Sequence, residues 1–273
     1  MSGRRRRRWW VLQALRLVSQ GRAQVCACAG SPDQDLFRQQ RAGAWAKLRP
    51  SARELLRRAS EKFEVWGFSG AGRQHAAAAV ELLGPRHFGG RVVAAPDGGG
   101  GGAQVVGKLL AQALEGREHL LVVLDDSSCP WPSDRRNLLV AERYAFMPSA
   151  HDRRRPSLLE LGRDECPQRG MLAAASQILD RIHTQVFERA AARAPPEVWD
   201  ARAVMDDHRR RVLAGVGLVF SRVGPQNADP RAHPLWRLAE RFGGACSEAP
   251  GEGTTHVVAA AGGTDKATRV GVV

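Results

Sequence analysis

Two adjacent carboxylates, Asp125 and Asp126, directly follow a run of five apolar residues, Leu120 to Leu124. In a sheet of parallel strands, ligands bind beyond the carboxyl ends of the strands, so a metal or phosphate site belongs at this point. Two carboxylates there suit a hard cation such as Mg²⁺, which takes oxygen ligands and keeps several waters. On spacing alone, the ordinary alternative is a loop start in which one Asp caps the next element.

The elements that must position this pair alternate between strand and helix patterns. Ser51 and Glu54 have the spacing of a capping box that begins a helix. The other predicted helices cover residues 73–83, 104–115, 171–192 and 235–242, and the predicted strands cover 63–68, 91–94, 120–124, 218–221 and 255–259. Strands alternating with helices of this length predict an α/β fold with a parallel sheet covered on both faces.

The net charge of +13 suggests acidic partners, but its distribution weakens that inference. Residues 1–30 hold seven arginines and no acidic residue, and the five residues Arg4 to Arg8 form an unbroken basic run. That run has the composition of a nuclear-import signal or is sequence with no role. We therefore expect no direct nucleic-acid binding from charge alone.

Cysteines and apolar runs exclude two further classes of protein. The five cysteines are odd in number and widely spaced, which indicates neither a disulfide framework nor a zinc site. No apolar run is longer than five residues, the length of Leu120 to Leu124, whereas a membrane span needs about 20. We expect a reducing compartment and no membrane association.

Several segments of the chain, in order, resemble the RNA polymerase II C-terminal-domain phosphatases. The matching segments of the catalytic domain are Leu36-Phe-Arg, Trp45-Ala-Lys-Leu-Arg-Pro50, Phe63-Glu-Val-Trp-Gly-Phe-Ser69, Leu121-Val-Val-Leu-Asp-Asp126, Trp131-Pro132, Asn137-Leu-Leu-Val-Ala-Glu-Arg-Tyr144, Ser157-Leu-Leu-Glu160 and Arg163-Asp-Glu165. Later segments resemble the BRCT domain of the larger, plant-type members: Val212-Leu-Ala-Gly215, Val219-Phe-Ser-Arg222, His233-Pro-Leu-Trp236, Thr255-His-Val-Val258 and Gly263-Thr-Asp-Lys266.

The resemblance implies an α/β fold in two parts. The expected architecture is an incomplete haloacid-dehalogenase-like three-layer α/β/α domain followed by a small, C-terminally incomplete BRCT α/β domain. The expected boundaries are a basic, disordered head over residues 1–35, a partial phosphatase domain over 36–150, a connecting segment with one long helix over 151–209, and a partial BRCT domain over 210–273.

The family motifs also imply roles for residues of this chain. Ser69 takes the place of the hydroxyl residue that holds the transferring phosphoryl group, and Lys108 that of the lysine that balances its charge. Asp126 would be the Mg²⁺ ligand, with Asp125 as its supporting neighbour. A cation, a lysine and a hydroxyl donor stabilise phosphoryl oxygens while a nucleophile performs the covalent step.

The nucleophile of the family, the first Asp of Asp-x-Asp-x-Thr, is missing from its expected place. The segment Asp33-Gln-Asp35 fits the first three positions, but it lacks the hydroxyl residue and follows Gly-Ser-Pro instead of an apolar strand. We therefore expect an N-terminally truncated chain with weak or no turnover. We also expect the central strand of the sheet to be absent, which would leave buried backbone groups unpaired.

BRCT domains often bind phosphoserine peptides, and two residues match the positions that hold phosphate in such domains. These are Ser221, at the end of a predicted strand, and Lys266, near a helix start. Arg222 stands where binding versions usually have glycine. The alternative is a purely structural BRCT domain in which Lys266 is an ordinary exposed residue.

Two functions remain open. The first is a Mg²⁺-dependent protein serine/threonine phosphatase in the nucleus, acting on the phosphorylated C-terminal domain of RNA polymerase II. The second is a non-catalytic phosphopeptide-binding or regulatory remnant that acts through the BRCT domain, with transcription factors as further partners.

Overall fold

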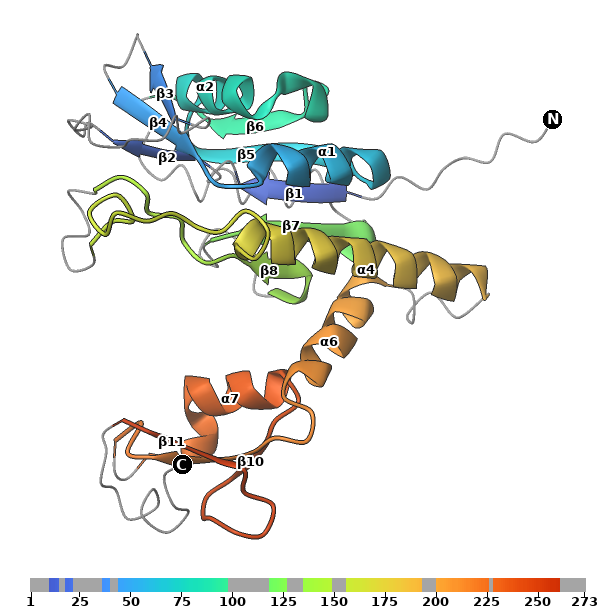
Figure 1. Cartoon of the computed structure of the whole chain (residues 1–273). Coiled ribbons are helices and arrows are strands. Elements are labelled where there is room, and N and C mark those ends of the chain that lie inside the picture. The colour runs from blue at the N-terminus through green and yellow to red at the C-terminus, as the bar shows by residue number, and fades with distance from the viewer. Residues whose placement is uncertain are drawn as a thin grey trace. The chain divides into compact units, whose positions relative to one another are not determined.

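A computed structural model describes residues 10–14, 18–21, 36–39, 44–97, 118–126, 135–148, 156–192, 200–225 and 228–260. The chain divides into two compact units, residues 1–202 and residues 203–273. Figure 1 shows an α/β arrangement in which helices accompany the strands.

The first unit is built on a five-stranded parallel sheet with the order β6-β5-β1-β7-β8. Its strands are β1 (Trp10–Ala14), β5 (Glu64–Gly72), β6 (Val92–Ala95), β7 (Leu121–Asp125) and β8 (Leu138–Val140). All five residues of β7 are buried, as expected for a strand inside a parallel sheet with covered faces.

Three helices accompany this sheet, namely α1 (Ala52–Lys62), α2 (Arg73–Leu83) and α4 (Met171–Ala191). Helix α1 contacts β5, α2 and α4, whereas α2 contacts β5 and β6. Each helix buries an apolar stripe at helical spacing, for example Leu55, Leu56 and Ala59 of α1. Short 3₁₀ turns cover Pro85–His87, Glu118–Leu120 and Arg135–Asn137.

A small antiparallel sheet with the order β2-β4-β3 completes the first unit. Its strands are β2 (Val18–Gly21), β3 (Leu36–Gln39) and β4 (Ala44–Leu48). A cluster of Tyr144, Phe146 and Met147 packs against Leu36 and Trp45 of this sheet.

The central strand of the large sheet is present, which corrects the expectation that it is missing and that residues 1–35 form a disordered head. Strand β1 pairs with both β5 and β7, Leu12 standing opposite Trp66 and Val123, and β2 also lies before residue 36. The stretch from Trp10 is too short to be recognised from its pattern. A central strand needs only a few residues, since neighbours on both sides satisfy its backbone groups.

The predicted capping box at Ser51 is also wrong. Ser51 has a left-handed backbone (φ 65°) and makes no side-chain cap to α1. Its hydroxyl instead donates a hydrogen bond to the carbonyl oxygen of Pro167, 2.7 Å away, while Glu54 accepts from the guanidinium of Arg57. The hydroxyl of Ser51 thus bonds to a residue far along the chain, whereas the local spacing predicted that it would cap the start of α1.

The second unit is a smaller α/β arrangement around a three-stranded parallel sheet with the order β10-β9-β11. Its strands are β9 (Gly217–Ser221), β10 (Ala245–Ser247) and β11 (His256–Ala259), and α7 (Pro234–Arg241) follows a 3₁₀ turn over Pro230–Ala232. Helix α6 (Ala201–Val212) precedes β9. It is a second helix at the end of the connecting segment, for which only one had been predicted.

Most helix and strand predictions agree with the described residues to within about two positions, a normal uncertainty for element ends. The predicted helix over 104–115 lies outside the described residues. No helix in the described part of the chain is long and apolar enough to cross a membrane.

Candidate functional site

The candidate site lies at the carboxyl edge of the large sheet, where Ser69 and Asp125 stand on either side of the central strand. Ser69 belongs to β5 and Asp125 ends β7, and β1 pairs with both strands. Both side chains are buried, with 6% and 5% of their surface exposed. Parallel pairing therefore places at the same end of the sheet two polar residues that are 56 positions apart in the sequence.

Hydrogen bonds from the segment that contains β8 hold both ends of β7 in place. The amide of Asn137 donates from Nδ2 to the carbonyl oxygen of Leu121 at 2.7 Å. The backbone N–H of Ala141 donates to the carbonyl oxygen of Asp125 at 2.8 Å. The backbone beneath the carboxylate pair is thus tied to β8, and this limits movement of Asp125 and Asp126.

The carboxylate pair fits Mg²⁺ in the chemistry of its donors. Within the described residues, no group of three or more His, Cys, Asp or Glu side chains could enclose a metal ion. A protein site for Mg²⁺ commonly supplies one or two carboxylates, and water and substrate phosphate complete the shell. Asp125 and Asp126 match that pattern.

The backbone that follows Ser69 leads into the first turn of α2. Gly72 is the N-cap of this helix, and the carboxylate of Asp97 accepts a 3.3 Å hydrogen bond from the backbone N–H of Gln74. A Cβ atom on Gly72 would lie 2.0 Å from Oδ1 of Asp97. A side chain at position 72 would therefore displace the carboxylate of Asp97, which satisfies one donor of the helix start.

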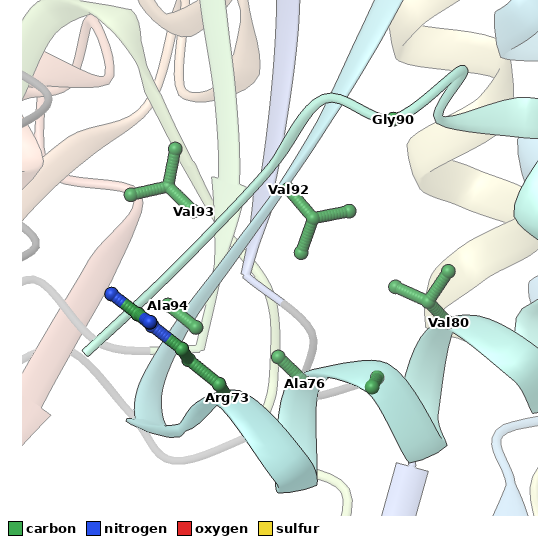
Figure 2. Close-up of a pocket in the computed structure, with 8 residues that line it drawn as sticks. Arg73, Ala76, Val80, Gly90, Val92, Val93 and Ala94 are labelled. Atoms are coloured by element: carbon green, nitrogen blue, oxygen red, sulfur yellow. The ribbon is translucent and has the colours of Figure 1, made fainter. Parts of the chain in front are cut away.

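A pocket of about 510 Å³ lies between α2 and β6. It is lined by one face of α2 and by the strand beside it, namely Arg73, Ala76, Ala77, Val80, Gly90, Val92, Val93 and Ala94. Figure 2 shows Val92 and Val80 directed into the space between the helix and the strand, with Arg73 beside Ala94 at one end. No sequence motif indicated this pocket; the spacing of Arg73, Ala77 and Val80 along one helix face was the signal available.

The second unit has a polar site of its own, at the carboxyl end of β9. Ser221 is buried, with 4% of its surface exposed, and lines a pocket of about 940 Å³ together with Arg222 and His233. Nδ1 of His233 accepts a hydrogen bond from the backbone N–H of Leu235, which caps α7. Arg222 has a left-handed backbone (φ 54°), unusual for a residue that carries a side chain.

Not every residue singled out in the sequence can be placed. Ser69, Asp125 and Asp126 share one edge of the large sheet, and Ser221 lines the pocket of the second unit. Lys108, Lys266, the Asp33-Gln-Asp35 segment and the run Arg4–Arg8 lie outside the described residues.

The fold and the polar edge of its sheet define a class of protein: a parallel α/β domain with polar residues at the carboxyl ends of its strands, followed by a second, smaller α/β unit. Solved structures with this fold include two of an RNA polymerase II CTD phosphatase. "The Structure of Fcp1, an essential RNA polymerase II CTD phosphatase" matches 96% of this chain and 87% of its own, with a TM-score of 0.68 and 17% identity. A single-residue variant of the fission yeast phosphatase Fcp1, bound to beryllium fluoride, matches 97% and 88%, with a TM-score of 0.69 and 18% identity.

Sequence comparison gives closer relatives. RNA polymerase II C-terminal domain phosphatase-like 3 of Arabidopsis thaliana is 37% identical over 246 residues, which are 86% of this chain and 19% of that protein. Phosphatase-like 4 of the same plant is 36% identical over 226 residues, which are 81% of this chain and 50% of that protein. The chain thus spans half or less of the length of these relatives. No family model matches it.

The chain belongs to the RNA polymerase II C-terminal-domain phosphatase family. The predicted family and the predicted α/β fold class are thereby confirmed.

Proposed function

We propose that this chain is a homologue of protein serine/threonine phosphatases that binds the phosphorylated C-terminal domain of RNA polymerase II in the nucleus. We further propose that it hydrolyses the phosphoserine of this substrate weakly or not at all. The observation that carries the proposal is the placement of Ser69 and Asp125 on the two strands that flank β1 at one edge of the sheet. The names of the relatives supply the substrate class.

The residues at this edge suit the recognition of a phosphoryl group. The hydroxyl of Ser69 can donate a hydrogen bond to a phosphoryl oxygen, an acceptor with which such bonds are short and strong. Asp125 and Asp126 would hold Mg²⁺, which supplies positive charge beside the phosphoryl oxygens when bound. Lys108 is proposed as a second source of positive charge.

Weak turnover follows from the composition of the strand between these residues. Strand β1 reads Trp-Val-Leu-Gln-Ala, and Gln13 pairs with both Gly67 and Leu124 next to the polar edge. Ser69 and the carboxylate pair are assigned to binding the phosphoryl group and Mg²⁺, so covalent catalysis at this edge needs a further carboxylate, hydroxyl or thiol to act as the nucleophile. The described residues of the central strand include none of these.

A single pair of measurements tests the proposal. Binding of a fluorescent polymerase-repeat peptide, with and without phosphoserine, is measured with Mg²⁺ present, and phosphate release is measured on the same samples. We expect binding that requires the phosphate, and release no greater than that of the Asp126→Ala variant. Release clearly above that variant would contradict weak turnover, whereas equal binding of both peptides would contradict phosphate recognition.

A second candidate function is phosphopeptide binding by the smaller unit, acting as a BRCT domain toward phosphorylated transcription factors. The burial of Ser221 beside Arg222 in the pocket at the end of β9 favours it, because a hydroxyl and a guanidinium can both donate to phosphate. Titrating the phosphopeptide against Lys266→Ala and Ser221→Ala tests it. Unchanged affinity in Lys266→Ala removes that lysine from the site, and unchanged affinity in both variants refutes the candidate.

A further inference from the structure

The pocket between α2 and β6 begins beside Ser69. Ser69 of β5 pairs with Ala94 of β6, and paired residues of neighbouring strands project from the same face of a sheet. Ala94 lines the pocket, as does Arg73, four positions after Ser69. The space therefore opens at the phosphoryl-binding edge and extends along α2 as far as Val80.

The walls of this pocket are apolar because of the residues that α2 and β6 direct toward it. Ala76, Ala77 and Val80 follow Arg73 at helical spacing and so share a face of α2. From the strand, Val92 projects into the pocket (Figure 2), whereas Val93 packs against the core cluster that contains Phe68. The small alanines leave a space wide enough for an apolar side chain.

Positive charge at the open end comes from Arg73 alone among the residues that line the pocket. Within the described part of the chain, its guanidinium has neither a hydrogen bond nor an ion pair, and the residue is exposed. The nearby carboxylate of Asp97 is engaged by the backbone N–H of Gln74. An anionic ligand would thus meet a cation that has no other partner at this point.

We propose that this pocket binds the residues next to the phosphorylated residue of the peptide, an apolar side chain entering between Ala77, Val80 and Val92 while a second anionic group pairs with Arg73. This inference rests on the proposed function, since it extends the peptide from the edge that holds the phosphoryl group. It adds selectivity for peptides in which a phosphoserine has both an apolar neighbour and a second negative charge.

Two variants of the full chain probe the two parts of the pocket separately. Arg73→Gln removes the cation, and Arg86→Gln is its control, because Arg86 is exposed, lies outside the pocket and changes the net charge equally. Ala77→Leu fills the space beside Val80 without changing the charge, and Ala77→Ser is the control that leaves the space open. Neither position is buried, so the fold is retained.

Affinity is measured by fluorescence anisotropy with polymerase-repeat peptides that carry one or two phosphoserines. A third peptide has its apolar residues replaced by serine. We expect Arg73→Gln to lower the affinity for the doubly phosphorylated peptide by about fivefold, as for the loss of one charge-assisted contact. The affinity for the singly phosphorylated peptide should fall much less. Ala77→Leu should lower the affinity for both phosphopeptides by about tenfold but leave that for the apolar-depleted peptide nearly unchanged.

Equal affinities of the wild type, Arg73→Gln and Ala77→Leu for every phosphopeptide would overturn the inference while leaving phosphate recognition intact. If the wild-type chain binds phosphorylated and unphosphorylated peptides with equal affinity, the proposed function is refuted, and the inference with it. A circular-dichroism melt of each variant shows that any loss of affinity is not a loss of fold.

Discussion

Arg49 and Glu165 are 116 positions apart in the sequence, yet their side chains form a two-pronged ion pair with N···O distances of 2.6 and 3.0 Å. Arg49 is almost wholly buried, at 2% exposure, and also donates from Nη1 to the carbonyl oxygen of Glu142 at 2.6 Å. The neighbouring Lys47 is equally buried and lies 3.3 Å from the carboxylate of Asp164. Two buried cations thus join the end of β4 to the segment before α4.

The first prediction concerns the partner of that buried arginine. Glu165→Ala leaves the guanidinium of Arg49 without its carboxylate, and we expect the free energy of unfolding to fall by about 3 kcal/mol, as for other broken buried pairs. Urea denaturation followed by circular dichroism measures the change. Asp207→Ala is the matched control, because its pair with Arg210 is exposed and should contribute less than about 0.5 kcal/mol. Similar losses in both variants would contradict the prediction.

A second prediction separates backbone strain from crowding in the smaller unit. Gly243 has a φ of +90°, and a Cβ atom there would lie 1.8 Å from the carbonyl oxygen of Arg210. Gly243→Ala should therefore destabilise this unit by about 3 kcal/mol, combining strain and a backbone clash. At Gly215 the φ is +81° but no atom lies within 4 Å of the added Cβ, so Gly215→Ala should cost only about 1 kcal/mol.

Hydrogen exchange measures these two variants in one experiment, because it reports the protection of β9 and β11 separately from that of the first unit. Gly243→Ala should lower protection in β9 and β11 much more than Gly215→Ala does, with the larger sheet unaffected. Equal losses in the two variants would show that strain alone, and not the contact with Arg210, sets the cost.

The third prediction is a dependence of stability on pH. Burial between Phe63 and Phe187 lowers the pKa of His183 below its ordinary value of 6.5, and repulsion by Lys62 adds to the effect although Asp180 opposes it. The unfolded chain then binds more protons than the folded one below about pH 6.5, so stability is complete above that pH and falls as the pH decreases. Urea midpoints between about pH 7.5 and 5.5 should show this fall.

His183→Leu should flatten that pH profile without removing it. His87 also has a lowered pKa, because of its burial and the charge of Arg86, and this second group remains in the variant. A profile as steep as that of the wild type would mean that His183 contributes nothing to the effect.

The fourth prediction concerns the proposed metal ligands. Asp126→Asn removes one of the two carboxylate charges, so we expect Mg²⁺ affinity to fall by at least about tenfold when it is measured by isothermal titration calorimetry. The readout is binding and does not depend on turnover. Asp207→Asn lies in the second unit and should leave the affinity unchanged; Mg²⁺ bound equally well by both variants would exclude Asp126 as a ligand.

Sequence alone determined much of the first unit and its candidate site. The apolar run before Asp125 and the helix stopped by Gly84-Pro85 are local patterns, so β7 and α2 were predicted within a residue or two. The general rule for parallel sheets then predicted a site at the carboxylate pair, and the family resemblance added Ser69 to it. The ordered family segments led to the same fold class and family.

Tertiary structure alone decided the rest. Strand β1 is stabilised by β5 and β7 on its two sides, and the composition of its five residues does not predict a central place in the sheet. Ser51 matched a helix cap locally but hydrogen-bonds to Pro167 instead. The pocket beside Arg73 depends on the distance between a helix and a strand, and the pair of Arg49 with Glu165 joins distant segments. Such contacts are fixed when the elements pack, because local spacing carries no information about residues far along the chain.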